Sequence, residues 1–266
     1  YLVFSTADTA STSYHQQVFR IFKGNTTRSL KISPENSIKF IQTAPEKIVN
    51  EFKPGLRTRN FWKLDSIIRL HHDNVAAADI IYLSLCDTDV PVDTIRYYQS
   101  WLSERIQTSP FGARIRNYIT ARSRLIVGKK LPLFSLPDSS KRLCPIVPGA
   151  SEYILIDFWF SRCAPCLRSF PEMKQLYDSS RRSNLEIIGI SLDTKQDNKL
   201  WKSTIVKYGL TWPNLNDSKS VFTNEMLAIV NFPTRVLIDR NRNILLVDNT
   251  NSDDQFFEKV KMIINR

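Results

Sequence analysis

Hydrophobic residues recur with a helical period along much of the first half of the chain. From Ser33, which with Pro34 has the pattern of an N-cap and first helical turn, one apolar side is formed by Ile38, Phe40, Ile41, Ile48, Val49 and Phe52. Further helices are expected at about 59 to 71, 74 to 86, 92 to 108 and 110 to 126. The first 30 or so residues are polar, with one strand suggested at 18 to 22. Residues 1 to 127 are therefore predicted to form a mainly helical domain.

The period changes after residues 127 to 132, whose glycine and proline interrupt the helical pattern. Beyond this boundary the pattern predicts a hairpin at 132 to 147, strands at 153 to 160, 185 to 192, 234 to 239 and 243 to 248, and helices at 163 to 180, 197 to 209, 219 to 229 and 253 to 265. Strands that alternate with helices and then end in a hairpin and a helix favour an α/β fold with a mixed sheet. Residues 128 to 266 are predicted to be this second domain.

The most informative chemistry is the sequence Cys163-Ala164-Pro165-Cys166, which follows the predicted strand at 153 to 160. That strand is too apolar to lie at a surface, so we expect both of its faces to be covered. Beyond the cysteines, apolar residues at helical spacing are Leu167, Phe170, Met173 and Leu176. The first cysteine thus lies at or near a helix N-terminus, where unpaired N–H groups and the helix dipole stabilise a thiolate. Arg162 adds a positive charge next to it.

A second cysteine three residues later can reach the first without a movement of the backbone. A mixed disulfide formed at Cys163 can then be resolved by Cys166. Asp157, flanked by apolar residues in a buried strand, is expected to have a raised pKa and to take the proton from Cys166. The alternative is that Asp157 is a strand-end residue that meets solvent.

Length and charge exclude some classes of protein. At 266 residues and 42% hydrophobic content, the chain is expected to form two soluble domains. The net charge of +11 is evenly spread, with 17 basic and 11 acidic residues in 1 to 127 (+6) and 20 and 15 in the remainder (+5). Nucleic-acid binding is therefore not expected. The sequence contains no apolar run of the roughly 18 to 20 residues that span a membrane, and its start at Tyr1 would suit removal of a signal or lipoprotein leader with its lipid anchor.

The remaining metal and cysteine candidates are few. All three histidines, His15, His71 and His72, lie in the first half, so a zinc site or a cysteine–histidine pair beside the motif lacks ligands and no metal or cofactor is expected. Four cysteines are too few for a disulfide scaffold. Cys86 and Cys144 are interpreted as apolar fillers, with a bridge between them as the alternative.

The segment 157 to 166 resembles the active-site segment of thioredoxin-fold oxidoreductases. The resemblance implies a thioredoxin fold, a proton-transferring Asp157, a helix kink at Pro171 and a cis-proline loop at Phe232-Pro233-Thr234. An ordinary trans proline is the alternative for that loop. Arg162 departs from the tryptophan that many members carry, which puts the redox potential in doubt.

Within this superfamily the chain is most similar to the extracytoplasmic TlpA/ResA-like branch. This likeness rests on residues 128 to 136, on the Ile190-Ser191-Leu192-Asp193 segment with the helix of Trp201, and on residues 209 to 213; it covers about 128 to 266. It implies an enzyme of the periplasm or cell envelope that exchanges disulfides with partner proteins and with an upstream thiol-redox partner.

Each residue of the expected site has a role in disulfide exchange. Cys163 attacks, Cys166 resolves and Asp157 moves the proton. Substrate binding is expected to involve Trp159, which also packs and covers the edge of the site, together with Arg162, Phe232, Pro233 and Thr234. The backbone of Phe232 would pair with a substrate chain as a short antiparallel strand.

Two other functions are weighed. A peroxiredoxin-like peroxidase is disfavoured, because residues 158 to 162 lack the proline and hydroxyl residue that normally precede a lone peroxidatic cysteine, and the resolving thiol is adjacent. The other alternative is a ligand- or partner-binding protein of the cell envelope in which the helical half recognises its target and the redox pair is secondary. A disulfide-reduction assay would separate it from the enzyme.

Overall fold

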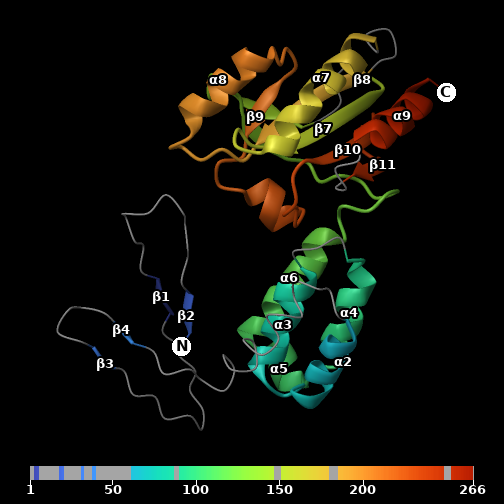
Figure 1. Cartoon of the computed structure of the whole chain (residues 1–266). Helices are drawn as coiled ribbons and strands as arrows, with labels where there is room; N and C mark the ends of the chain where they lie inside the picture. The colour runs from blue at the N-terminus through green and yellow to red at the C-terminus, as the bar shows by residue number, and fades with distance from the viewer. Residues whose placement is uncertain are drawn as a thin grey trace. The chain divides into compact units, whose positions relative to one another are not determined.

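The structure of the chain is a computed structural model, which describes residues 3–5, 18–20, 31–32, 38–39, 61–86, 90–146, 151–179, 185–248 and 253–265 (Figure 1). The chain divides into two units, Tyr1–Pro54 and Gly55–Arg266. All the predicted site residues belong to the second unit.

Four short strands are described in the first unit. Strand β1 (Val3–Ser5) pairs antiparallel with β2 (Val18–Arg20), and β3 (Lys31–Ile32) pairs antiparallel with β4 (Ile38–Lys39). The strand expected at 18 to 22 is thus confirmed over three residues. The helix expected from Ser33 is wrong at Ile38–Lys39, where backbone pairing with β3 replaces helical hydrogen bonds. The rest of that expected helix lies outside the described residues.

A helical segment precedes the α/β domain. It contains α2 (Phe61–Leu70), α3 (Val75–Leu85), α4 (Val92–Ser100), α5 (Glu104–Thr108) and α6 (Pro110–Arg122). The single helix predicted at 92 to 108 is wrong, since the chain turns between α4 and α5. At this turn the Ser103 side chain accepts a hydrogen bond from the Ile106 N–H group, while the Ser103 N–H group donates to the His72 carbonyl at 3.0 Å. Ser103 therefore starts a new helix.

The α/β domain is built on a five-stranded mixed sheet in the order β11-β10-β7-β8-β9. Its strands are β7 (Tyr153–Trp159), β8 (Leu185–Ser191), β9 (Asn214–Asn216), β10 (Thr234–Asp239) and β11 (Ile244–Asp248). β7 runs parallel to β8 and antiparallel to β10, and β10 is antiparallel to β11. Strand β9, which runs parallel to β8, was not predicted, because its three residues are too few to show an alternation of apolar and polar positions.

Helices and a small hairpin complete the domain. The helices are α7 (Ala164–Ser179), α8 (Asn198–Tyr208), the π-helix η1 (Val221–Met226) and α9 (Asp253–Ile264). The hairpin consists of β5 (Ser135–Pro137) and β6 (Leu143–Pro145). These elements agree with the predicted ones to within a few residues, and the fold is thioredoxin-like.

Two apolar clusters cover the two faces of the sheet. Alternate residues of β7 contribute to each: Leu155 and Trp159 pack with α7, α8 and α9, while Ile154, Ile156 and Phe158 pack with the hairpin and η1. This double coverage explains why the β7 sequence is almost continuously apolar. Asp157 lies on the first face, between Leu155 and Trp159.

Candidate active site

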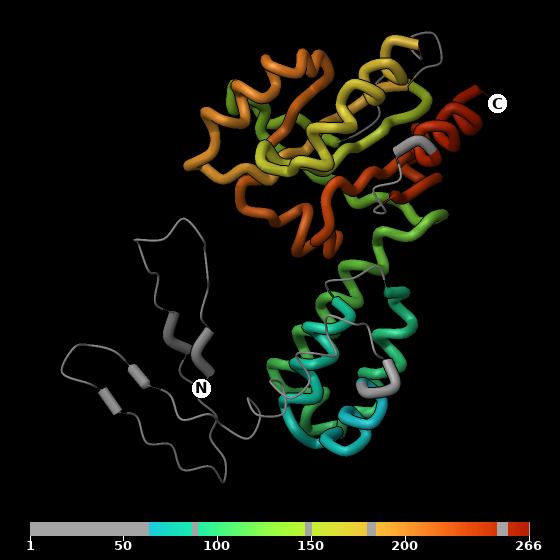
Figure 2. The backbone as a smooth tube through the Cα atoms, viewed as in Figure 1, coloured from blue at the N-terminus to red at the C-terminus, as the bar shows by residue number. Residues whose placement is uncertain are grey.

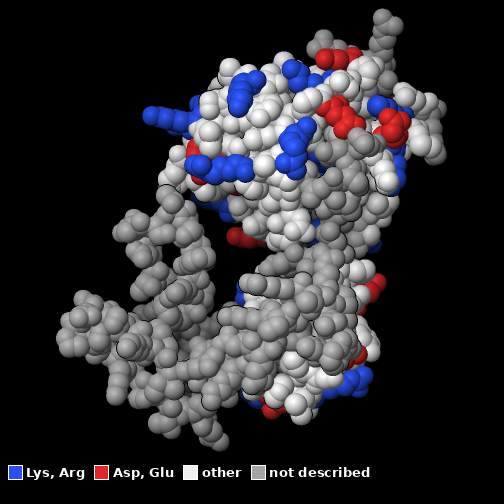
Figure 3. All heavy atoms as spheres, viewed as in Figure 1, with Lys and Arg blue, Asp and Glu red and all other residues white. Residues whose placement is uncertain are grey.

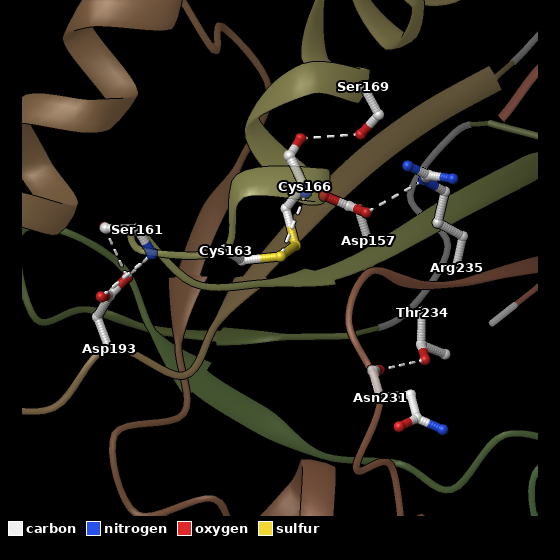
Figure 4. The surroundings of a disulfide bond; sticks show 9 residues. All are labelled: Asp157, Ser161, Cys163, Cys166, Ser169, Asp193, Asn231, Thr234 and Arg235. Carbon is white, nitrogen blue, oxygen red and sulfur yellow. Dashed lines mark hydrogen bonds and ion pairs between the residues drawn. A yellow bond between two sulfur atoms is a disulfide. The ribbon is translucent and has the colours of Figure 1, made fainter. Parts of the chain in front are cut away.

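The two cysteines of the motif form a disulfide bond at the start of α7 (Figure 4). Cys163 directly precedes the helix, and its carbonyl accepts the N–H group of Leu167 at 3.0 Å, which is the first helical hydrogen bond. The N–H group of Cys166 donates to the Sγ atom of Cys163 at 3.2 Å. Cys163 thus occupies the place of an N-cap residue, with its sulfur as the acceptor. The expected position of this sulfur at a helix N-terminus is confirmed.

Exposure differs between the two sulfur-bearing residues. Cys163 is 4% exposed and Cys166 is fully buried. Ala164, between them, is exposed, so the turn itself faces solvent at the side of Cys163. Of the two cysteine residues, Cys163 is therefore the more exposed.

Aromatic packing and a proline shape the active-site helix. Phe170 is buried and meets the ring of Trp159 edge to face, with 5.1 Å between the ring centroids. Pro171, which has no N–H group to donate, lies inside α7 at the position expected for a kink. Trp159 is fully buried. Its packing role is therefore confirmed, while its expected role as a cover for the site and a substrate contact finds no support in this geometry.

The loop before β10 contains a cis peptide bond between Phe232 and Pro233. The Oγ1 atom of Thr234 donates to the Asn231 carbonyl at 2.7 Å, which ties the loop together. The half-buried Phe232 ring packs edge to face on Phe160, with centroids 5.5 Å apart. Phe160 in turn accepts the N–H group of Cys163 at 2.9 Å. The expected cis bond is confirmed, and Phe160 connects this loop to the cysteine turn.

Asp157 is 1% exposed, so the solvent-facing alternative is wrong. Its Oδ1 atom lies 3.4 Å from Nε of Arg235, a fully buried arginine on the neighbouring strand β10. In Figure 4 the Asp157 carboxyl group points toward Cys166, and a dashed line joins it to the Arg235 guanidinium on the other side. The expectation of a raised pKa considered burial alone, whereas this guanidinium favours the ionised carboxylate.

Arg235 is a site residue that sequence reasoning missed. The signal was present, because Arg235 is a basic residue inside an otherwise apolar predicted strand, two positions after Pro233. A buried arginine is rare without a partner. Its partner could be found only from the antiparallel register of β10 and β7, which pairs Arg235 with Asp157.

Arg162 is directed toward α8. Its Nη2 atom lies 2.9 Å from Oδ1 of Asp197, the residue before α8, and its side chain is 70% exposed. Hydrogen bonds from Arg162 and Thr194 lower the pKa of Asp197 below its usual value. The positive charge expected beside the thiolate is thus shared with a carboxylate.

A buried carboxylate anchors the loop that leads to Cys163. Asp193, after β8, accepts hydrogen bonds from the N–H group of Ser161 at 2.9 Å, from Ser161 Oγ at 2.8 Å and from Ser191 Oγ at 2.6 Å. All three residues are buried. Asp193 was quoted above only as part of the family likeness, and its anchoring role was missed.

Neither Cys86 nor Cys144 is part of a disulfide bond, so the alternative of a bridge between them is wrong. Cys86 is buried, and Cys144 is half-buried in β6. Among the described residues, no group of three or more histidine, cysteine or acidic side chains could hold a metal ion. The helices described include none that is both long and apolar enough to cross a membrane.

Comparisons with known proteins find relatives of the α/β domain. Residues 151–244 match the family model described as thioredoxin-like. The thiol-disulfide oxidoreductase ResA of Geobacillus thermodenitrificans is 27% identical over 128 residues, which are 48% of this chain and 72% of the relative. ResA of Bacillus thuringiensis is 24% identical over 149 residues, 56% of this chain and 84% of the relative.

Among solved structures, a thiol:disulfide interchange protein DsbE of Chlorobium tepidum is 25% identical, with a TM-score of 0.46, over 52% of this chain and 97% of that chain.

Chemically, two cysteine sulfur atoms joined in a disulfide at a helix N-terminus can accept two electrons and release them again.

Proposed function

We infer that this chain, whose C-terminal half is a thioredoxin-like domain similar to ResA, is a thiol-disulfide oxidoreductase that exchanges disulfides with partner proteins. One observation carries the proposal: the Cys163–Cys166 disulfide lies at the N-terminus of α7, where the Cys163 sulfur accepts a backbone N–H group and Cys163 is the more exposed residue of the two. This position favours a nucleophilic thiolate in the reduced protein.

The proposed reaction begins with the reduced pair. The Cys163 thiolate attacks a substrate disulfide, forms a mixed disulfide and releases the first substrate sulfur as a thiolate. Cys166 then gives its proton to Asp157 and attacks the Cys163 sulfur. The Cys163–Cys166 disulfide forms, the second substrate thiolate leaves, and two electrons have passed to the substrate. The proton on Asp157 returns to solvent or to the departing thiolate.

The loop around Phe232 is proposed to hold the partner chain. Phe232 and Phe160 form a half-buried aromatic pair, and Phe160 hydrogen-bonds the N–H group of Cys163. A substrate strand that pairs with the Phe232 backbone would bring its sulfur toward Cys163. Pro233 and Thr234 shape this loop from buried positions.

The partners and the cell compartment are also part of the proposal. The likeness to the thiol-disulfide oxidoreductase ResA supports thiols and disulfides as substrates. An upstream thiol-redox partner and a location in the periplasm or cell envelope are proposed from the resemblance of residues 128 to 266 to the TlpA/ResA-like branch. On the face of the described residues that Figure 3 shows, lysine and arginine side chains are separated by uncharged and acidic ones. This distribution does not resemble the continuous basic stripe of nucleic-acid-binding proteins.

We propose that the redox domain begins at residue 128 and follows a mainly helical N-terminal domain. The backbones of Gly128 and Leu131 donate hydrogen bonds to the carbonyls of Ile244 and Arg242, at 2.8 and 2.9 Å, so this segment follows the edge of β11. Helix α6 has ended at Arg122. Figure 2 traces the chain from α6 through this segment into the redox domain.

A disulfide-reduction assay tests the proposed function. The purified chain should accelerate the reduction of insulin disulfides by dithiothreitol, and Cys163→Ser should abolish the acceleration. A Cys144→Ser variant is the matched control and should keep the full rate, because Cys144 is free and lies in the β5–β6 hairpin. The proposal fails if the wild-type chain gives no acceleration.

A further inference from the structure

Arg235 lies between two buried carboxylates. Its Nε atom is 3.4 Å from Oδ1 of Asp157, and its Nη1 atom is 3.6 Å from Oδ2 of Asp248. The exposed fractions of the three side chains are 0% for Arg235, 1% for Asp157 and 9% for Asp248. The register of the sheet explains the arrangement, because Arg235 of β10 is opposite Asp157 of β7 on one side and Asp248 of β11 on the other.

Aromatic rings close the space around the guanidinium. The Arg235 guanidinium carbon lies 4.9 Å from the ring centroid of Phe257 and 5.6 Å from that of Phe256, both on α9. These rings favour a cation and exclude water. The low local dielectric strengthens the interactions between the three charged side chains.

The second carboxylate changes what the first can do. A lone Asp157–Arg235 pair would be neutral, and its carboxylate would resist protonation. Asp248 competes for the same guanidinium, so the three side chains together carry one net negative charge when both acids are ionised. Because of this net negative charge, Asp157 can accept a proton while its carboxyl group keeps its position near Cys166.

We propose that Arg235 is a positioning residue for the proton-transfer step, and that Asp248, by sharing its charge, keeps Asp157 able to take the proton from Cys166. This proposal rests on the proposed function. Arg235 orients the Asp157 carboxylate and stabilises its ionised form. Asp248 limits that stabilisation. The proton moves from the Cys166 thiol to Asp157, and no other group is oxidised or reduced in this step.

Other elements packed on this face add few charges. The turn before α7 and its first helical turn contribute the two cysteines, and β8 places Gly189 opposite Asp157. Glu186 of β8, whose pKa is raised by burial, is opposite Ile154 and so belongs to the other face of the sheet.

The half-buried lysines of α7 and α9 have other partners. Lys174 donates to the Tyr208 carbonyl, and Lys261 pairs with Glu258 and interacts with Glu172.

The test separates attack from resolution with 5,5′-dithiobis-(2-nitrobenzoate) as the probe. All measurements, the wild-type reference included, are made in a Cys144→Ser background, because the half-buried Cys144 thiol would itself react with the probe, whereas Cys86 is buried. The reduced chain should then release one equivalent of nitrothiobenzoate when Cys163 attacks and a second when Cys166 resolves the mixed disulfide. The rate of the second phase should fall at low pH, where Asp157 is already protonated. The midpoint of this fall is the quantity to compare among variants.

The two charge-removing variants should move the midpoint in opposite directions. Asp248→Asn removes a negative charge, so Asp157 holds a proton less tightly and the midpoint should fall by about 1 pH unit. Arg235→Gln removes the positive charge and should raise the midpoint by about 1 unit or more. Arg235→Lys should restore most of the wild-type value. Asp157→Asn should slow the second phase by about 100-fold and remove the midpoint.

The controls make the result decisive. Asp93→Asn, an exposed carboxylate on α4, should leave both phases unchanged. If Arg235→Gln does not fold, Asp248→Asn and Arg235→Lys still test the direction of the shift. The proposal is overturned if the variants lose rate while their midpoints stay at the wild-type value. Failure of the wild-type chain to release two equivalents would instead contradict the proposed function.

Discussion

The backbone N–H group of Cys166 donates a hydrogen bond to the sulfur of Cys163 at 3.2 Å. The two residues of the redox pair are therefore unequal, although both are cysteines in one helical turn. Cys163 receives the hydrogen bond that an N-cap residue would receive, whereas Cys166 is fully buried inside α7. On this difference we base the proposal that Cys163 attacks and Cys166 resolves.

Alkylation should follow this assignment. When the reduced chain is treated with iodoacetamide near pH 6 to 7, we expect Cys163 to be modified well before Cys166, because thiols at helix N-termini have pKa values of about 3.5 to 7.5. Peptide mass spectrometry measures the two sites separately, and the buried Cys86 is an internal reference for an unreactive thiol. Faster modification of Cys166 would reverse the roles.

Removal of the Arg162 side chain should have a small effect on the thiol. Because Arg162 is 70% exposed and pairs with Asp197, we expect Arg162→Ala to raise the pKa of Cys163 by about 0.5 unit or less. The oxidised form should become slightly harder to reduce. Titration of the thiolate absorbance at 240 nm measures the change, and a rise of about 2 units would show that Arg162 acts directly on the sulfur.

The same variant should change the titration of Asp197. Arg162 lowers the pKa of this carboxyl, so in Arg162→Ala that pKa should move up toward its usual value. In the wild-type chain the pair stabilises the fold at neutral pH, and this contribution is lost as the pH falls through the lowered pKa of Asp197. Carboxyl ¹³C NMR of both proteins checks the direction. Unchanged titration would mean that the pair does not form in solution.

Loss of Asp193 should destabilise the loop before the cysteines. Asp193→Ala leaves buried donors of Ser161 and Ser191 without their acceptor, which should lower the free energy of unfolding by about 2 to 3 kcal/mol. Urea denaturation measures this. Asp93→Ala is the control, since its carboxylate is exposed, and should change stability by less than about 0.5 kcal/mol. Equal stability of the two variants would argue against the anchor.

Local sequence patterns were sufficient to predict the central elements of the redox domain. The apolar run before Cys163 predicted β7, because a strand buried on both faces is almost continuously apolar. The spacing of Phe170 and Met173 predicted α7, because a helix buried on one side repeats its apolar residues with the helical period. The family likeness added the cis bond at Pro233. Such features depend on residues that are close together in the sequence.

The missed features depend on pairing between distant residues. Arg235 and Asp157 are brought together only by the register of β10 on β7, and Asp193 meets Ser161 only because β8 lies beside β7. Strand β4 replaced a predicted helix although its partner β3 is close in the sequence, because the two residues of β3 precede the periodic segment and carry no pattern of their own. Hydrophobic periodicity shows which side of a segment is buried, but it does not identify the segment that packs or pairs with it.

The trapping of mixed disulfides tests the central claim most directly. Cys166→Ser retains the attacking thiol and lacks the resolving one, so it should accumulate mixed disulfides with protein substrates through Cys163. Cys163→Ser should accumulate none. Non-reducing electrophoresis with and without dithiothreitol, after reaction with a disulfide-containing protein such as insulin, measures the adduct. Adducts on Cys166→Ser alone are the predicted result; equal trapping by both variants, or by neither, would contradict the account.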